Sequence, residues 1–181
     1  KDDIVHFTFA GNIGKVQNLD NIINAFSSLS DVYKKKSQLN IIGDGSNLKH
    51  LKTLSNNNKQ IVFHGSKPRK DMAKYFKASD FLIISLKNEK EFTATVPAKT
   101  QTYIAAKKPI LAFINGETAE IIIDNNLGLY ANPSDIESIK NVFEECIDMP
   151  NDKKEELVKN CDTLLSTTFN KKRIIENITK I

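Results

Sequence analysis

Short apolar runs alternate along the chain with longer segments in which apolar residues recur every three or four positions. The short runs, which are rich in β-branched side chains, predict strands, and the wider spacing predicts amphipathic helices. Leu19, Ile22, Ile23 and Phe26 illustrate the helical spacing. The predicted strands are Ile4–Ala10, Leu39–Ile42, Ile61–Phe63, Asp80–Ser85, Ile110–Ile114 and Leu127–Tyr130.

Helical segments separate these strands and fill the C-terminal part of the chain. We expect helices over Pro97–Ala106 and Glu117–Asp124, helical structure from Pro133 onward, and a last helix around Ile174–Ile178. Strands that alternate with helices predict right-handed crossovers and a parallel sheet. The continuous apolar run Phe81–Ile84 is typical of a strand buried on both faces. The pattern therefore predicts an α/β, three-layer Rossmann-like domain with about six parallel strands and helices on both faces.

Composition narrows the class of protein. A length of 181 residues fits one domain, and a net charge of +4 is well short of the strongly basic balance of a nucleic-acid binder, so we expect no nucleic-acid partner. Cys146, Cys161 and the three histidines, His6, His50 and His64, have no metal-ligand spacing, so we expect no metal and no cofactor. The cysteines are read as small apolar residues, which is compatible with a cytoplasmic protein.

Charge runs and the chain ends add two expectations. Lys34–Lys36 and Lys171–Arg173 are interpreted as solvated helix faces or, alternatively, as a basic face toward an anionic membrane or a phosphate-bearing ligand. No apolar run reaches the roughly 20 residues that span a bilayer. The first strand begins almost at Lys1 and no initiator Met precedes it, which predicts a fragment of a longer protein.

Ligands of parallel α/β sheets bind at the carboxyl ends of the strands, so the loops after the strands are the candidate site. Gly11-Asn12-Ile13-Gly14-Lys15 follows the first strand; its glycines allow close backbone approach and its amides can hold phosphate, or it is an ordinary turn. The spacing is not that of a dinucleotide fingerprint. Asp44, after the second strand, resembles the acidic ribose partner of such folds but is interpreted mainly as a turn residue.

Two further loops carry candidate chemistry. Thr95-Val96-Pro97-Ala98-Lys99 begins a helix, and its unpaired amides together with Lys99 predict an anion site; the alternative is that Thr95 only caps the helix. Asn115-Gly116-Glu117 closes the fifth strand, where Glu117 accepts from a ligand hydroxyl or is a first-turn helix acid. Nothing predicts Ser/His/Asp or Cys/His catalysis.

In order and spacing, these segments resemble family 4 (group 1) GT-B glycosyltransferases of the bacterial polysaccharide and O-antigen type. The resemblance is carried by the first loop, Phe9–Gln17, by Ile42-Gly43-Asp44-Gly45 and by Val62–Gly65. The most specific part is Thr95–Leu111, which is similar to the V-P-x-K-x-x-x-Y-x-A-x-x-K-P-I block of those enzymes, with Asn115–Glu117 following in step.

The resemblance implies that residues 1–181 are the C-terminal, nucleotide-sugar-binding domain of such an enzyme, and that an N-terminal acceptor domain is absent from this chain. It implies a retaining transfer of a sugar from a UDP- or GDP-type donor to a glycan or lipid-linked acceptor, without a metal, in the cytoplasm and at the inner face of the membrane. The donor-binding residues that it implies, with those from the loops above, are Gly11, Asn12, Gly14, Lys15, Gly43, Gly45, Gly65, Ser66, Lys67, Thr95, Val96, Lys99, Thr102 and Glu117.

The chain departs from the family pattern at several positions. Asn12 and Gln17 stand where Arg and Lys are common, and Ala94 and Thr102 stand where the family has a pair of Glu residues. Two alternatives stay open: one half of a nucleotide-sugar 2-epimerase, with His64 and Glu117 as its candidates, and a non-catalytic nucleotide-binding module.

Overall fold

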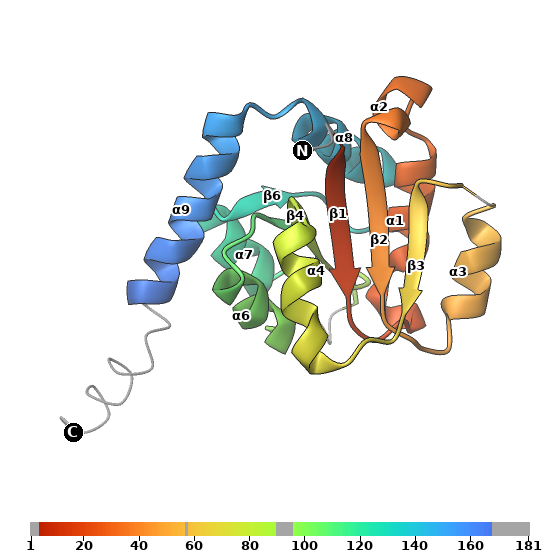
Figure 1. Cartoon of the computed structure of the whole chain (residues 1–181), viewed down its shortest axis with the longest axis horizontal. Helices are drawn as coiled ribbons and strands as arrows, with labels where there is room; N and C mark the ends of the chain where they lie inside the picture. Colours follow the sequence, from red (N-terminus) through yellow and green to blue (C-terminus); the bar gives the residue numbers. More distant parts are fainter. Residues whose placement is uncertain (1–3, 57, 90–95, 168–181) are drawn as a thin grey trace.

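A single parallel sheet of six strands organises the molecule (Figure 1). The computed structural model describes residues 4–56, 58–89 and 96–167. The strand order is β3-β2-β1-β4-β5-β6. The strands are β1 (Val5–Ala10), β2 (Ser37–Ile42), β3 (Ile61–Gly65), β4 (Phe81–Ser85), β5 (Ile110–Phe113) and β6 (Gly128–Tyr130).

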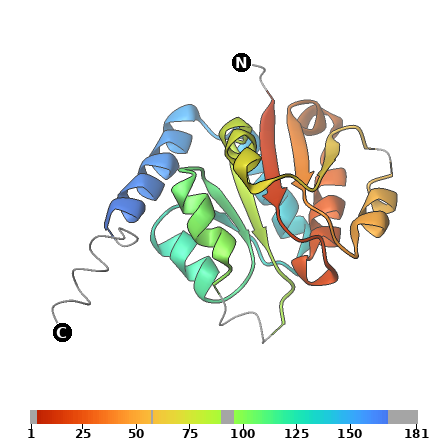
Figure 2. The same ribbon diagram turned by 60° about the horizontal axis from the view of Figure 1, so that its bottom comes forward.

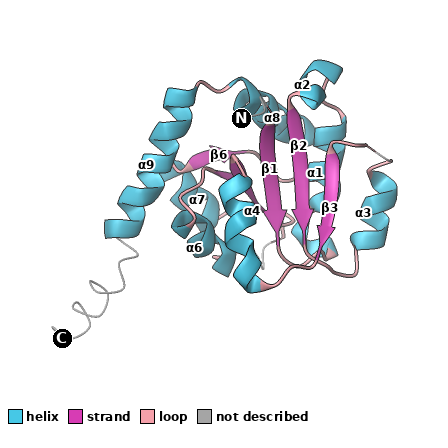
Figure 3. Ribbon diagram, in the orientation of Figure 1, coloured by secondary structure: helices cyan, strands magenta, loops and turns pink. Residues whose placement is uncertain are grey.

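Helices cover both faces of this sheet (Figures 1 and 3). One face carries α1 (Leu19–Ser27), α3 (Leu48–Leu54) and α8 (Ile136–Asp148). The other carries α4 (Met72–Ala78), α6 (Ala98–Ala105), α7 (Glu117–Asp124) and α9 (Asn151–Thr167), as the turned view shows (Figure 2). Shorter elements are η1 (Lys15–Gln17), α2 (Asp31–Lys35) and η2 (Arg69–Asp71).

The sheet separates two apolar cores. In the core beneath α1 and α8, the Phe7 ring stacks on Phe81 at 5.6 Å and meets the Phe143 ring edge-on at 4.8 Å. Such aromatic pairs add about 0.5–1.5 kcal/mol each beyond their buried area. The second core, beneath α4 and α6, contains Tyr103 and Ile104. Alternate residues of each strand reach opposite cores, because successive side chains point to opposite faces.

Backbone hydrogen bonds join the loops at the carboxyl ends of β1, β2 and β3. Gly11 N donates to Ile42 O at 2.9 Å, Ile13 N to Asp44 O at 2.8 Å, and Gly43 N to Gly65 O at 3.0 Å. Gly43 has a φ of +144°, and a Cβ at this position would lie 1.8 Å from the Gly11 carbonyl oxygen. Glycine is therefore required at Gly43, both for the backbone conformation and for the close approach of the two loops.

The structure confirms the fold class and all six strands predicted from the sequence, with boundaries that move by one or two residues. Helix α7 has the predicted bounds. Pro97 is the N-cap of α6 rather than its first helical residue, so the helix begins one residue later than we expected. Helix α2 was not predicted, and the expected helix around 174–178 lies outside the described residues. Within the described ranges, no helix is both long enough and apolar enough to cross a bilayer.

The contact between Gly43 and Gly11 gives a test of how the loops are held together. We expect Gly43→Ala to lower the free energy of unfolding by about 3 kcal/mol or more, because backbone atoms must move to admit the methyl group. Gly65→Ala is the matched control: its φ is +68° and its Cβ would meet nothing within 4 Å. That control should cost only about 1 kcal/mol, from the left-handed conformation alone. Equal losses in urea denaturation would contradict the steric explanation.

Candidate functional site

Strands β1 and β4 part at their carboxyl ends, and this gap is the centre of the site. Their register covers Phe7↔Phe81 and Thr8↔Leu82, so Ala10 has no strand partner on the β4 side. The Tyr103 hydroxyl is the hydrogen-bond partner of Ala10 on that side: it accepts from Ala10 N at 3.1 Å and donates to Ala10 O at 3.2 Å. The sheet order reverses between these two strands, and such a switch point is where open α/β sheets bind ligands.

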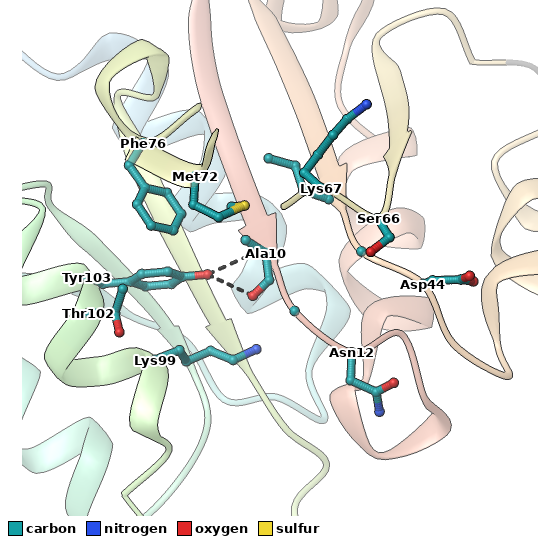
Figure 4. A pocket seen from close by; sticks show the side chains of 13 residues that line it. Ala10, Asn12, Asp44, Ser66, Lys67, Met72, Phe76, Lys99, Thr102 and Tyr103 are labelled. Atoms are coloured by element: carbon teal, nitrogen blue, oxygen red, sulfur yellow. Dashed lines mark hydrogen bonds between the residues drawn. The ribbon is translucent and has the colours of Figure 1, made fainter. Parts of the chain in front are cut away.

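A pocket of about 370 Å³ opens at this gap (Figure 4). This volume is within the usual range for small-molecule sites. The ends of β1 and β2, the loop after β3, and helices α4 and α6 surround it. The lining residues are Ala10, Gly11, Asn12, Ile42, Gly43, Asp44, Ser66, Lys67, Met72, Phe76, Lys99, Thr102 and Tyr103.

Lys99 provides the cation that lies against the end of β1. It extends from the first turn of α6 toward the backbone of Gly11 (Figure 4), where its Nζ is 2.9 Å from the position of a Cβ on that glycine. The same Nζ lies 4.2 Å from the centroid of the Phe9 ring, a cation–π contact. Lys99, Thr102 and Tyr103 share one face of α6 because residues three and four apart are neighbours on a helix.

Burial weakens the charged form of Lys99. It lowers the pKa of the ammonium from 10.5 to about 8. Among the described residues, Lys99 makes no hydrogen bond and no ion pair with a carboxylate. A partly buried ammonium without such a partner favours an anionic ligand, which restores the interactions that the cation lost with water.

The open side of the pocket is polar. Asp44 uses its carboxylate Oδ1 to accept from Gly45 N at 2.7 Å and its carbonyl to accept from Ile13 N, so it does act as a turn residue while also lining the pocket. The Thr102 hydroxyl donates to Ala98 O at 3.4 Å, a long contact that leaves the oxygen free to accept. Ser66 and Lys67 close the pocket from the loop after β3.

The structure brings half of the predicted donor-binding residues to this pocket. These are Gly11, Asn12, Gly43, Ser66, Lys67, Lys99 and Thr102. Six others lie outside its lining: Gly14, Lys15, Gly45, Gly65, Val96 and Glu117. Thr95, the remaining one, lies outside the described residues, so the prediction that it caps α6 stays a prediction.

The first loop shows why Gly14 and Lys15 are placed apart from the pocket. The Gly14 amide donates to Gln17 Oε1 at 2.8 Å, so this N–H already has a partner. Lys15 begins the short helix η1 and is exposed. The part of the loop that lines the pocket is therefore its start, Gly11 and Asn12, rather than its end.

Sequence reasoning missed the residues that form the pocket wall. Tyr103, Met72 and Phe76 come from α6 and α4, and each was visible in the sequence only as an apolar position of a helix. For Tyr103 a signal existed: it follows Lys99 by four residues and must therefore share its face of α6. Met72 and Phe76 are placed by the packing of α4 beside α6, for which the sequence held no local signal.

His64 and Glu117, the candidates for epimerase chemistry, do not line the pocket. The His64 Nε2 lies 2.8 Å from Asn40 Oδ1, and its ring meets that of Tyr75 edge-on at 5.4 Å. Burial, with a smaller contribution from Lys67, lowers the pKa of His64 and favours the neutral ring. Glu117 is an exposed residue in the first turn of α7. His64 thus makes structural contacts, and Glu117 occupies the helix position that the alternative interpretation gave it.

Metal and thiol chemistry have no candidate groups in the part of the chain that the structure describes. No set of three or more His, Cys, Asp or Glu side chains lies close enough together there to hold a metal ion. Cys146 and Cys161 are free and buried, and burial raises the pKa of both thiols, to about 11 for Cys161. Neither thiol is therefore activated as a nucleophile.

Comparison with known families gives a match over most of the chain. The family model described as glycosyl transferases group 1 matches residues 2–163. A curated relative, described as a probable glycosyltransferase WbjE from Pseudomonas aeruginosa, is 27% identical over 147 residues, which is 79% of this chain and 36% of the relative. The chain thus spans about a third of that relative's length.

Solved structures share the fold. The chain is similar to WaaG, a glycosyltransferase involved in lipopolysaccharide biosynthesis, with a TM-score of 0.77 and 19% identity over 93% of this chain and 44% of that one. Anabaena Alr3699/HepE in complex with UDP gives a TM-score of 0.79 and 16% identity, covering 99% and 50%. The C-terminal domain of LpcC from Francisella tularensis, a glycosyl transferase group 1 family protein, gives 0.73 and 19%, covering 92% and 87%.

The hydrogen bonds of Tyr103 provide a test of the pocket's framework. We expect Tyr103→Phe to lower the free energy of unfolding by about 1–3 kcal/mol, because the N–H and C=O of Ala10 lose their shared partner in a buried position. Tyr130→Phe is the control, since Tyr130 is exposed and its hydroxyl donates to Asn115 Oδ1 at the surface. The control should change stability by less than about 0.5 kcal/mol. Thermal and urea denaturation measure both, and equal effects would argue against a framework role.

Proposed function

The chain belongs to the group 1 glycosyl transferases, and on that premise we propose that it is the donor-binding domain of a retaining glycosyltransferase. The donor is a nucleotide diphosphate sugar of the UDP or GDP type. The acceptor is a glycan or a lipid-linked saccharide held by a separate N-terminal domain. The two buried, unpaired cysteines fit a protein that works in the reducing cytoplasm.

One observation carries the proposal: a partly buried ammonium at the switch point of the sheet, without an anionic partner among the described residues. Lys99 holds this cation beside the backbone of Gly11, at the meeting point of the loops after β1, β2 and β3. A charge-assisted hydrogen bond from an ammonium to a phosphate oxygen is stronger than one between neutral groups. The pyrophosphate of a donor is a ligand of the required charge and size for this position.

The pocket accommodates the rest of the donor around that pyrophosphate. The diphosphate lies between Lys99 and the Gly11–Asn12 backbone, the ribose lies toward Thr102, and the base lies toward the backbone of Ser66 and Lys67. Anabaena HepE, which has the same fold, is described in complex with UDP and with UDP and glucose, and this supports a uridine nucleotide as the first ligand to test.

Lys99 also supplies the electrostatic part of the proposed mechanism. When the bond between the sugar and the diphosphate breaks, negative charge builds up on the leaving phosphate. The Lys99 ammonium, held in place by the Phe9 ring and by α6, stabilises that charge without reorganising. In this scheme the cation of Lys99 performs the task that a divalent metal performs in other transferases.

In the proposed enzyme the acceptor is bound by another domain, so donor binding and sugar transfer are separate properties of this chain. The similar C-terminal domain of LpcC is matched over 87% of its length, whereas WaaG is matched over 44% of its length. We therefore expect the 181-residue chain to bind donor nucleotides without transferring sugar. Transferase activity from this chain alone would contradict the division into two domains.

Substitution of Lys99 tests the site directly. We expect Lys99→Met to weaken the binding of UDP or GDP by about 1.5–3 kcal/mol, the usual worth of a hydrogen bond to a charged group. Lys154→Met is the matched control, because the Lys154 Nζ also lies over a phenylalanine ring, that of Phe81, at 5.7 Å, but outside the pocket. Calorimetry with both variants decides the matter: an unchanged affinity in Lys99→Met, or an equal loss in both, removes the site assignment.

The pKa of Lys99 predicts how donor binding depends on pH. In the free protein the ammonium loses its proton near pH 8, and a bound diphosphate raises that pKa. Binding must then take up a proton above pH 8, so the dissociation constant should rise about tenfold between pH 7 and pH 9. Titration of a nucleotide diphosphate sugar in this range measures the effect. The Lys99→Met variant must lose it, and a pH dependence that persists in the variant would assign the effect to another group.

A further inference from the structure

Cationic side chains are concentrated in one short segment of the chain. Residues 67–77, which form η2 and most of α4, contain Lys67, Arg69, Lys70, Lys74 and Lys77, with Asp71 as the one acid. Residues 117–148, by contrast, contain eight acids and one lysine. Helix α8, which holds half of those acids, lies across the sheet from α4 (Figure 1). The positive charge is thus local to η2 and α4, because α7 on the same face carries Glu117, Glu120 and Asp124.

An apolar groove lies beside this cationic segment. It lies between α4 and α6, has a volume of about 530 Å³, and has Ala73 and Ala105 exposed in its walls. The lining residues are Arg69, Met72, Ala73, Phe76, Lys77, Thr102, Ala105, Ala106 and Lys108. Met72, Phe76 and Thr102 also line the donor pocket, so the groove opens directly beside it.

Arg69, Lys77 and Lys108 line the groove, and Lys70, Lys74 and Lys107 are their neighbours in sequence; these cations differ in what they already bind. Lys74 pairs with Asp71 at 3.4 Å, Lys107 pairs with Asp162 at 2.7 Å, and Lys108 donates to the carbonyls of Lys77 and Ser79. The other three, Arg69, Lys70 and Lys77, are exposed. For these three, the described part of the chain provides no carboxylate within 4.0 Å. The groove therefore combines an apolar floor with a rim of charges that are available to anions.

We propose that the α4–α6 groove is a docking surface for an anionic phospholipid membrane. The phosphates of the lipid headgroups lie against Arg69, Lys70 and Lys77, and the apolar segment of a lipid enters between Ala73 and Ala105. Basic side chains that flank an apolar surface are the combination that holds proteins at anionic bilayers. A small soluble phosphate ligand would use the rim and leave the apolar floor without a role.

This inference goes beyond the proposed function, since it requires neither donor binding nor catalysis. Its consequence for the proposed function is that it places the bilayer relative to the donor pocket. A bilayer seated on the groove lies next to the donor pocket, because the two cavities share Met72, Phe76 and Thr102. A lipid-linked acceptor confined to that bilayer is then presented close to the donor.

Vesicle co-sedimentation of the 181-residue chain tests the surface. The probe is vesicles of phosphatidylcholine with about one third phosphatidylglycerol, compared with phosphatidylcholine alone, at low and physiological salt. We expect binding to the anionic vesicles only. The triple variant Arg69→Gln, Lys70→Gln and Lys77→Gln should lower the partition coefficient by about 100-fold, at about fivefold for each charge.

Matched controls separate docking at the groove from general adsorption. Lys34→Gln, Lys35→Gln and Lys36→Gln remove the same number of charges at and just after α2, and should change binding by less than threefold. Ala105→Glu places a carboxylate in the groove wall and should also abolish binding, whereas Ala105→Gln should reduce it less. UDP affinity should be retained in all of these variants, because none of the substituted residues lines the donor pocket. This separates the present inference from the proposed function.

Four results would overturn the proposal. They are an absence of binding to anionic vesicles, an equal loss in the two triple variants, wild-type binding by Ala105→Glu, and loss of binding only when Lys171, Lys172 and Arg173 are neutralised. The last result would assign membrane contact to the C-terminal segment instead. Equal binding to double-stranded DNA at the same phosphate concentration would count as polyanion adsorption and would likewise exclude a lipid surface.

Discussion

The hydroxyl of Tyr103 replaces a strand where the sheet has none. Beyond Thr8↔Leu82 the two central strands part, and buried backbone groups at such a point need a hydrogen-bond partner. By bonding to both the N–H and the C=O of Ala10, Tyr103 fixes the distance and rotation of α6 relative to the end of β1. Lys99 lies one turn earlier on the same helix, so its position beside Gly11 follows from that one side chain. The position of the Lys99 charge in the pocket thus depends on the uncharged hydrogen bonds between Tyr103 and Ala10.

The other walls of the pocket depend on backbone contacts rather than on side chains. Gly11, Gly43 and Gly65 bring three loops into one hydrogen-bonded surface, and the contact between Gly43 and Gly11 leaves no room for a Cβ. A surface built from backbone atoms has a fixed shape whatever its side chains are. Asn12 and Thr102, which depart from the family pattern, are exposed at the edge of this surface, and their side chains can differ without disturbing it.

Local signals in the sequence were sufficient to predict the fold and to single out Lys99 as a candidate site residue. The apolar runs predicted all six strands, and the helix after Pro97 places Lys99 in the lining of the pocket, where the binding of an anion stays a prediction. Gly14 was harder to judge, because its amide is occupied by Gln17, a contact that depends on the η1 turn. The parting of β1 and β4, and with it the role of Tyr103, arises from long-range packing and has no local pattern. The short helix α2 was not predicted because so short a helix shows almost no periodicity in its apolar residues.

The contact between Lys99 and Phe9 joins parts of the molecule that are otherwise separated by the sheet. Lys99 belongs to α6 on one side, while the Phe9 ring belongs to the core on the other side. A ligand that attracts the Lys99 ammonium therefore competes with the cation–π contact between Lys99 and the Phe9 ring. Through this single contact the pocket borders the core beneath α1 and α8, although those helices lie on the far side of the sheet from α6.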